Sequence, residues 1–252
     1  MQFASLGSGS KGNATVVRKG STRLMIDCGF SLRETERRLA RLGEEAANLT
    51  AILVTHEHAD HIRGVGPLAR KFSLPVLITR GTANHQGLGK LPQQQCIDVD
   101  ETLVVGAFEI QPYPVPHDAR EPCQYVIDDG NRRFGMLTDT GSLTEHIKQS
   151  LSACDALLLE CNHDREMLKN GPYPYHLKQR VSGRFGHLSN DQAAELLQHL
   201  DTTKLKHLVA AHLSEQNNTP EFARQALSAA LGCEEDWISV ADQHNGLGWR
   251  HI

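Results

Sequence analysis

The segment Thr55-His56-Glu57-His58-Ala59-Asp60-His61 directly follows the apolar run Ala51-Ile52-Leu53-Val54. It gathers three imidazoles and acidic side chains at the end of an expected buried strand, where charged groups are costly unless they bind a charged partner. Histidine and aspartate are common ligands of divalent cations, so the segment predicts a pair of metal ions. A His-rich surface loop, the alternative in a chain with 14 histidines, would need neither the preceding strand nor further ligands downstream.

Length and composition indicate one globular unit. The chain has 252 residues, of which 39% are hydrophobic and 22% charged, and no linker, charge block or repeat divides it. We therefore expect a single domain over residues 1–252. The chain shows no signal peptide and no apolar run of membrane-spanning length, so we expect a cytoplasmic protein without a membrane partner. The oligomeric state is left open.

Two further compositional features limit the chemistry. The six cysteines form no Cys-x-x-Cys pair, which argues against a disulfide framework and against a thiolate zinc site. The net charge of −4 gives no global attraction to nucleic acid, so a role on nucleic acid depends on local positive charge.

Apolar runs with strand character alternate with helical patterns along the chain. Asp128-Asp129-Gly130-Asn131 has the composition of a hairpin turn. Hairpins among interleaved helices predict two mixed sheets between helices, an αββα sandwich of the α/β (α+β) class, although periodicity alone does not select it over other mixed folds. The expected strands are Thr22–Cys28, Ala51–Thr55, Pro75–Thr79, Leu103–Pro112, Gln124–Asp128, Phe134–Thr138, Ala156–Glu160 and His207–Ala211.

Three helix starts are marked by capping residues. Ser31 predicts a helix from Leu32 to about Leu42, with Glu34 closing a capping box and Gly43 ending the helix. Ser189-Asn190-Asp191-Gln192 opens a second helix in the same way, and Thr219-Pro220-Glu221 opens a third.

Further candidate ligands end three later strands. A catalytic ion takes about three protein ligands and leaves a position for water. His56 and His58 can converge on one ion, and Asp60 and His61 can face a second. Two comparable shells result if His117 joins the first ion, His212 the second, and Asp139 bridges both. Taken singly, these last three could be ordinary strand or helix caps.

The order Thr-His-x-His-x-Asp-His, then His, Asp and a final His resembles the metallo-β-lactamase superfamily over most of the chain. The resemblance implies the αββα sandwich, and it implies that Asp27 supports the metal loop without binding metal. Two ions would hold a hydroxide that attacks the substrate and would stabilise the leaving group, which makes the expected reaction a hydrolysis. Zinc, manganese and iron all suit these ligands. The implied metal ligands are His56, His58 and His117 at the first ion, Asp60, His61 and His212 at the second, and Asp139 at both, with Asp60 also catalytic.

A second resemblance bears on the substrate. Gly186-His187-Leu188-Ser189-Asn190 is similar to the Gly-His-Ser-Thr loop of RNase Z, which makes His187 a candidate general acid, with helix capping as the alternative. The YycJ/WalJ-type exonucleases resemble this chain most closely, in that segment, in Gly7–Ala14, in Glu160–Asp164 and in His212–Asn218. Where that family usually has Ser, this chain has Cys161. The resemblance implies a 5′-to-3′ exonuclease on double-stranded DNA.

Residues beside these motifs are candidates for contacts with nucleic acid. Local positive charge comes from Arg165 and Lys169, and from Lys178, Arg180 and Arg184 before His187. Guanidinium groups can grip phosphate bidentately, although scattered cations are more often a solvated face. Asp164 is expected to support the site. The candidate substrate-binding residues are Ser8, Lys11, Asn13, His163, Arg180, Arg184, Ser214, Asn217 and Asn218.

Three alternatives stay open. The same ions could serve a thioester or lactone hydrolase of the glyoxalase II kind, or a small-molecule cyclic phosphodiesterase. A metal-stabilised scaffold would need a degraded ligand set, whereas all seven ligand positions are filled. The gaps between His117, Asp139 and His212 leave no room for the cap domain of RNase J, and the long arm of RNase Z is missing.

Overall fold

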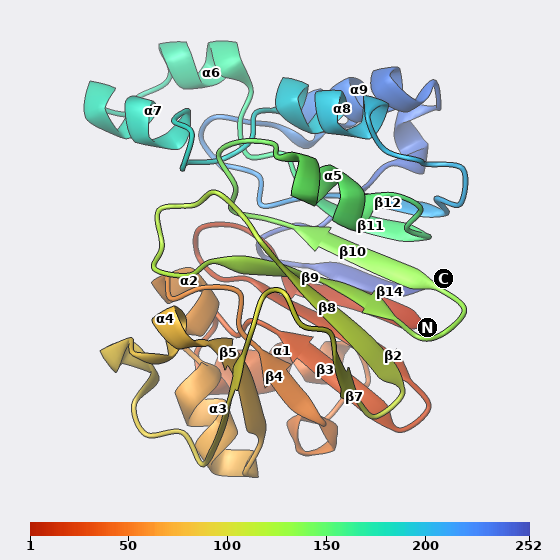
Figure 1. The fold of residues 1–252 in the computed structure, drawn as a ribbon. Coiled ribbons are helices and arrows are strands. Elements are labelled where there is room, and N and C mark those ends of the chain that lie inside the picture. Colours follow the sequence, from red (N-terminus) through yellow and green to blue (C-terminus); the bar gives the residue numbers. More distant parts are fainter.

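The computed structural model describes residues 1–252 and shows two facing β-sheets between outer layers of helices (Figure 1). This arrangement confirms the expected αββα sandwich. One seven-stranded sheet has the order β14-β1-β2-β3-β4-β5-β6, and the other has the order β13-β12-β11-β10-β9-β8-β7. The first contains β1 Gln2–Gly7, β2 Ala14–Lys19, β3 Thr22–Ile26, β4 Ala51–Leu53, β5 Pro75–Thr79, β6 Gln93–Ile97 and β14 Leu247–His251. The second contains β7 Leu103–Val105, β8 Phe108–Pro114, β9 Cys123–Asp128, β10 Arg133–Leu137, β11 Ala156–Glu160, β12 His207–Ala211 and β13 Ser239–Val240.

Helices cover the outer face of each sheet. In Figure 1, α1 and α3 lie against the first sheet, while α5, α8 and α9 lie against the second. The helices are α1 Leu32–Arg41, α2 Ala59–Ile62, α3 Val65–Phe72, α4 Arg80–Ala83, α5 Glu145–Leu151, α6 Arg165–Asn170, α7 Tyr175–Val181, α8 Asn190–Gln198 and α9 Pro220–Leu231. Short 3-10 turns occupy Ala46–Asn48, Gln86–Leu88 and Glu235–Trp237. None of the helices is long and apolar enough to cross a bilayer.

Side-chain alternation along the strands builds the layers. On β3, Leu24 and Ile26 enter the core between the sheets, whereas Met25 packs on the opposite side under the helices. The rings of Phe3 and Phe134 stack across the two sheets with centroids 4.4 Å apart. The two sheets therefore share one apolar interior, and polar side chains are left to the strand ends.

Most of the expected strands agree with the structure to within two residues at either end, whereas β1, β2, β6, β13 and β14 were not predicted. Two of the expected features are wrong. The run Leu103–Pro112 is not one strand, because Gly106, at φ 57°, turns the chain and pairs β7 with β8 antiparallel. Glu34 does not close a capping box on α1, because its carboxylate pairs with Arg37 and Arg38. The Ser31 cap, the Asp128–Asn131 hairpin and the Ser189–Gln192 capping box are confirmed.

Strand direction brings the polar segments to one edge. β3, β4 and β5 run parallel, as do β10, β11 and β12 in the other sheet. Carboxyl ends of parallel strands meet at the same edge of a sheet, which is where α/β folds bind ligands. The residues that follow these strands are therefore placed together.

Candidate metal centre

Three histidines form the first part of the site. His56 and His58 lie between the end of β4 and the start of α2, and His117 follows β8. Nε2 of His56 is 3.0 Å from Nδ1 of His58, and Nε2 of His117 is 3.2 Å from the same atom. Such a convergence of three ring nitrogens can hold one cation.

A second cluster joins Asp60, His61 and His212. Nε2 of His61 is 3.5 Å from Oδ2 of Asp60, and Nε2 of His212 is 3.7 Å from the same oxygen. Asp139 lies between the clusters: its Oδ2 is 3.2 Å from Nε2 of His61, and its Oδ1 is 4.0 Å from Nε2 of His117. The structure therefore brings together all seven side chains that the sequence analysis assigned to metal.

Asp27 fixes the orientation of the loop. Its carboxylate accepts hydrogen bonds from the backbone N–H and the hydroxyl of Thr55, both at 2.8 Å, and it lies 2.8 Å from Nδ1 of His61. With Nδ1 bonded in this way, Nε2 of His61 faces Asp60 and Asp139. A carboxylate behind a metal-binding histidine is the usual way to set its ring orientation and basicity.

Close backbone contact holds α2 against the end of β3. The N–H of Cys28 donates to the carbonyl of His61, and the N–H of Asn13 donates to that of Asp60, both at 2.8 Å. A Cβ on Gly29 would lie 1.7 Å from the carbonyl oxygen of Asp60, so only glycine allows this approach.

The residues present fit divalent cations. Oδ2 of Asp139 and Nε2 of His212 are buried without a hydrogen-bond partner, which is costly unless a cation contacts them. No Lys or Arg side chain lies within ion-pair distance of the carboxylates of Asp27, Asp60 or Asp139, whose only ion-pair contacts are with histidines. The cluster is rich in negative charge that no Lys or Arg side chain compensates. It is also rich in nitrogen and oxygen atoms that can bind a cation.

The pKa shifts follow from this crowding. Burial, together with the nearby His61, holds the pKa of His56 well below its ordinary value, so that its ring is neutral and able to bind a cation. Burial also opposes a charge on His212, but the carboxylates of Asp139, Asp60 and Glu160 outweigh it and raise its pKa to about 10. In the absence of cations, protons on histidine thus balance the buried carboxylates.

Glu160, at the end of β11, is a central residue that the sequence analysis did not assign. Its side chain is fully buried, and its Oε1 is 2.7 Å from Nδ1 of His187 and 3.3 Å from Nδ1 of His212. Its Oε2 accepts hydrogen bonds from the N–H groups of Thr140 and Leu188. Burial opposes its ionisation, but the adjacent His187 and His212 lower the pKa of Glu160 to about 2. A charged residue ending an otherwise apolar strand was the available signal.

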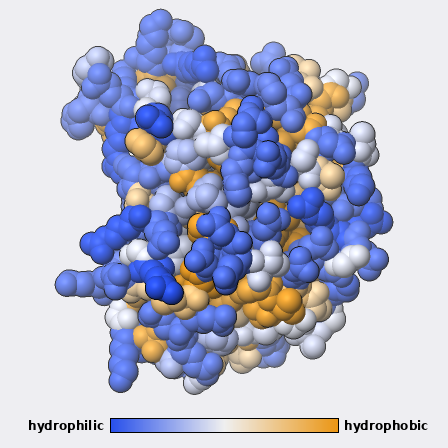
Figure 2. All heavy atoms as spheres, viewed as in Figure 1, coloured by the Kyte–Doolittle hydropathy of each residue, from blue (hydrophilic) through white to orange (hydrophobic).

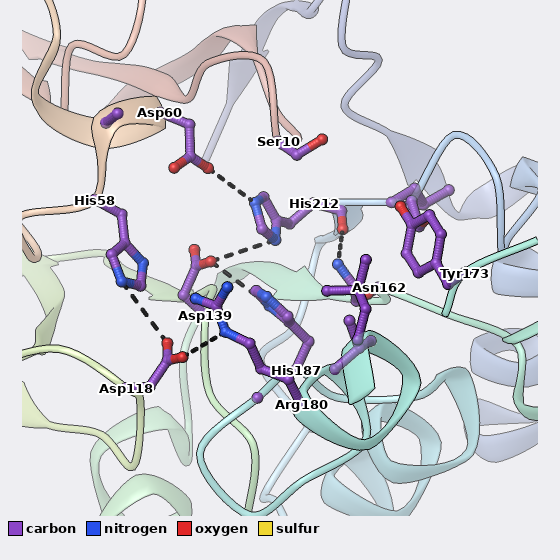
Figure 3. Close-up of a pocket in the computed structure, with 16 residues that line it drawn as sticks. Ser10, His58, Asp60, Asp118, Asp139, Asn162, Tyr173, Arg180, His187 and His212 are labelled. Carbon is purple, nitrogen blue, oxygen red and sulfur yellow. Dashed lines mark hydrogen bonds and ion pairs between the residues drawn. The ribbon is translucent and has the colours of Figure 1, made fainter. Parts of the chain in front are cut away.

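These groups open into a pocket of about 350 Å³. Figure 3 shows Asp60, Asp139, His187 and His212 pointing toward one another along one wall. The mouth carries Arg180, whose guanidinium pairs with Asp118 at 2.7 Å. Asp118, also not anticipated, lies 3.7 Å from Nε2 of His58 and 3.5 Å from Nε2 of His117. Tyr173 lines the opposite side.

Few of the expected substrate contacts reach this pocket. Arg180 and Ser214 line it. Ser8 and Asn13 are instead buried supports: the Ser8 hydroxyl accepts from the N–H of His212 at 2.9 Å, and the Asn13 amide donates to Oδ2 of Asp60 at 3.2 Å. Asp164 caps α6 through the N–H of Met167.

The other candidate substrate-binding residues interact with other parts of the protein. Asn218 donates to the carbonyl of Cys161 and exchanges hydrogen bonds with Asn190, while Asn217 is fully buried. The remaining three candidates lie away from the pocket: exposed Lys11 pairs with Glu215, Arg184 lies over the ring of Phe185, and His163 is buried behind the pocket wall.

Comparison with known proteins agrees with this geometry. The sequence pattern of the Beta-lactamase superfamily domain matches residues 22–212. The chain is similar to exodeoxyribonuclease YycJ of Bacillus anthracis, with 37% identity over 96% of this chain and 92% of that protein. It is also similar to exodeoxyribonuclease WalJ of Streptococcus pneumoniae, with 34% identity over 95% of this chain and 91% of that protein. In fold, it resembles the metallo-β-lactamase fold protein YhfI of Bacillus subtilis, with a TM-score of 0.76 and 19% identity over 99% of both chains.

The role of Asp27 can be tested with Asp27→Asn. This residue has φ 59°, a conformation that asparagine also tolerates, so the change removes the charge with little backbone strain. We expect metal affinity, measured by competition with a chelator, to fall about 10- to 100-fold while the circular dichroism spectrum is kept. Asp236→Ala, at an exposed position, is the control. Unchanged affinity in Asp27→Asn would contradict the orienting role.

Metal removal should make stability depend on pH. Because the pKa of His212 in the metal-free fold is raised to about 10, its protonation stabilises the fold fully below about pH 6.5, and this stabilisation is lost as pH rises toward 10. Metal ions would replace those protons. We therefore expect the difference in melting temperature between metal-loaded and chelated protein to grow from pH 6.5 to pH 9. A constant or shrinking difference would argue against cations in this cluster.

Proposed function

The chain belongs to the metallo-β-lactamase superfamily, and from that premise we propose that this hydrolase is a phosphodiesterase that uses two divalent ions to degrade double-stranded DNA from its 5′ ends. The hydrolase class follows from the superfamily. The choice of DNA is supported by one observation above all, namely that the exodeoxyribonucleases YycJ and WalJ are similar over nearly the whole chain.

The metal-binding residues divide into two sets. His56, His58 and His117 would hold one ion, and Asp60, His61 and His212 a second, with Asp139 within reach of both sets. When bound, two such ions supply an acidified water and neutralise charge on the phosphate and the leaving oxygen. Manganese and zinc both suit this mixture of imidazole and carboxylate.

His187 is placed to protonate the leaving group. Its ring lines the pocket, and its Nδ1 donates to Glu160, so Nε2 is the atom that can carry a proton toward the substrate. Burial opposes protonation of His187, but the Glu160 carboxylate outweighs burial and raises the pKa of the imidazole. A general acid works best when its pKa lies near or above the working pH. Glu160 acts as the positioning residue for this acid.

This acid also favours phosphodiesters over thioesters. The leaving oxygen of a nucleotide is strongly basic and needs a proton, whereas a thiol has a pKa near 8.5 and leaves readily as a thiolate. The buried His187–Glu160 pair would add little to thioester hydrolysis. At the mouth, the Arg180 guanidinium can exchange Asp118 for a phosphate oxygen and so hold the backbone.

The proposed activity is tested with end-labelled substrates. Wild-type protein supplied with manganese or zinc should shorten duplex DNA labelled at the 3′ end progressively, and it should release mononucleotides from a 5′ label at once. Single strands, RNA, a cyclic dinucleotide and a thioester should react much more slowly. Faster turnover of the thioester, or fragments of internal origin, would overturn the proposal.

Loss of one ligand of the second ion should stop turnover without unfolding the chain. In Asp60→Asn the geometry is kept but a charge that faces both His61 and His212 is lost. We expect turnover to fall by at least about 10²-fold and bound metal, measured by mass spectrometry, to decrease. Normal turnover after this change and after chelation would refute the metal mechanism.

Substitutions of His187 and Glu160 should change the kinetics in a different way from substitutions of metal ligands. His187→Ala should lower kcat on DNA by about 10²- to 10⁴-fold, with metal content and KM nearly unchanged. Glu160→Gln should lower kcat less and move the basic limb of the pH profile to lower pH, because the raised pKa of His187 depends on Glu160. His199→Ala, an exposed histidine at the end of α8, is the control. DNA in which sulfur replaces the leaving oxygen should be cleaved equally by wild type and His187→Ala, and a continued deficit there would contradict the acid role.

A further inference from the structure

A second hollow lies on the other side of α7 from the metal pocket. Its volume is about 270 Å³, and it is enclosed by α6, α7 and the start of α8. Three of its side chains are cationic and none is a carboxylate. Its lining consists of His163, Arg165, Leu168, Lys169, Lys178, Ser182 and Gln192.

The cations of this hollow are only weakly neutralised. Arg165 pairs with Asp191 at 3.3 Å, but these two side chains are 60% and 67% exposed, so water screens the pair. Lys178 donates to the backbone carbonyl of Lys169 at 2.6 Å and has no carboxylate within ion-pair distance. Lys169 pairs with Glu166 at 3.4 Å, and both side chains are 71% exposed, so water screens this pair strongly. The concave, positively charged surface is therefore free to bind an anion.

A buried histidine adds an independent feature. His163 is 1% exposed and borders the hollow, yet its Nδ1 has no hydrogen-bond partner. Burial lowers the pKa of His163 to about 4, so the ring is neutral and offers one N–H donor. The Nδ1 atom has almost no accessible surface, so a ligand in the hollow meets the other atoms of the ring, and the signals of His163 report on binding there.

The position of α7 relates this hollow to the metal pocket. Leu177, Arg180 and Val181 line the metal pocket, whereas Lys178 and Ser182 line the second hollow. A helix with its side chains is roughly 10–12 Å across. One strand of a nucleic-acid duplex advances roughly 3.4 Å per nucleotide and so spans such a width in a few nucleotides. In Figure 1, α6 and α7 stand beyond the sheets, and in Figure 2 this end of the molecule is mostly hydrophilic.

We propose that the hollow lined by Lys178, Lys169 and His163 is a phosphate-binding subsite, which holds a backbone phosphate of the substrate a few nucleotides from the cleaved bond. Its place in the reaction rests on the proposed function, whereas its affinity for phosphate does not. The same chemistry would accept free phosphate or a released mononucleotide, and the experiments below separate these sources.

Removal of single cations tests the subsite. Lys178→Ala and Lys169→Ala should each raise KM for a duplex oligonucleotide about tenfold, the usual effect of losing a hydrogen bond to a charged group. The salt dependence of binding should weaken by about 0.9 in log–log slope for each lost phosphate contact. Hydrolysis of bis(p-nitrophenyl) phosphate, which fills only the metal pocket, should be unchanged. Lys178→Arg should restore KM, which a merely structural role for the lysine would not require.

The control is Lys90→Ala, an exposed lysine in the loop before β6. It removes the same charge from the chain but not from the hollow. If Lys90→Ala raises KM as much as Lys178→Ala, the effect is one of net charge and the subsite is refuted. The subsite would likewise be refuted if Lys178→Ala lowered the rate of bis(p-nitrophenyl) phosphate hydrolysis by the same factor as it raised KM for the duplex.

A methylphosphonate scan locates the bound phosphate. Neutralising one phosphate at a time should weaken binding by wild type at one position a few nucleotides from the cleaved bond. At that position, the same substitution should not weaken binding by the Lys178→Ala variant any further. An equal penalty in both proteins at every position would overturn the assignment to the backbone.

Binding of inorganic phosphate to chelated protein, followed through the histidine signals by NMR, separates this proposal from the proposed function. Phosphate that shifts His163 in wild type but not in Lys178→Ala supports the subsite even if no phosphodiester is hydrolysed. If that shift occurs while the methylphosphonate scan is flat, free phosphate or a mononucleotide is the ligand, and the backbone assignment is wrong. No shift together with a flat scan refutes the subsite altogether.

Discussion

Buried negative charge without a lysine or arginine beside it is the constraint on which the site depends. The carboxylates of Asp60, Asp139 and Glu160 lie close together, and imidazoles are the only ionisable side chains of basic character within ion-pair distance of them. Isolated buried carboxylates cost several kcal/mol unless they are paired or neutralised. Protons on His61 and His212 can balance them, but divalent cations do so more completely and keep the histidines neutral as ligands.

Part of the free-energy cost of bringing these side chains together is strain in the backbone. Asp27, Asp139 and His212 all have positive φ, at 59°, 53° and 54°, and each lies within two residues of the end of a strand. Such conformations cost on the order of 1–3 kcal/mol each for residues other than glycine. They turn the side chains inward at the common edge of the two sheets. The shared apolar core, which fixes β3, β10 and β12, holds them there.

The sequence indicated the fold and the metal cluster because both leave local signals. Alternating apolar residues mark the strands, and ligands at strand ends are recognisable from spacing, as His56 and Asp139 were. Glu160 escaped notice because one carboxylate after Ala156-Leu157-Leu158-Leu159 resembles an ordinary strand terminus. Conversely, Ser8 and Asn13 were assigned to substrate but support His212 and Asp60. A polar residue in a glycine-rich loop gives the same sequence pattern whether its side chain faces a ligand or the protein interior. Only tertiary packing distinguishes these two orientations.

In the proposed function, different parts of the chain provide the chemistry and the selection of substrate. The metal residues sit at the ends of buried strands, where packing fixes their geometry to the precision that catalysis requires. Helix α7, in contrast, buries none of its residues and yet lines both the metal pocket and the second hollow. A weakly packed helix can vary in sequence at little cost to the core, so changes there alter charge and reach without disturbing the metal centre. Under the proposed function, the segment between β11 and α8 can therefore set which phosphates are held while the positions of the metal ligands stay the same.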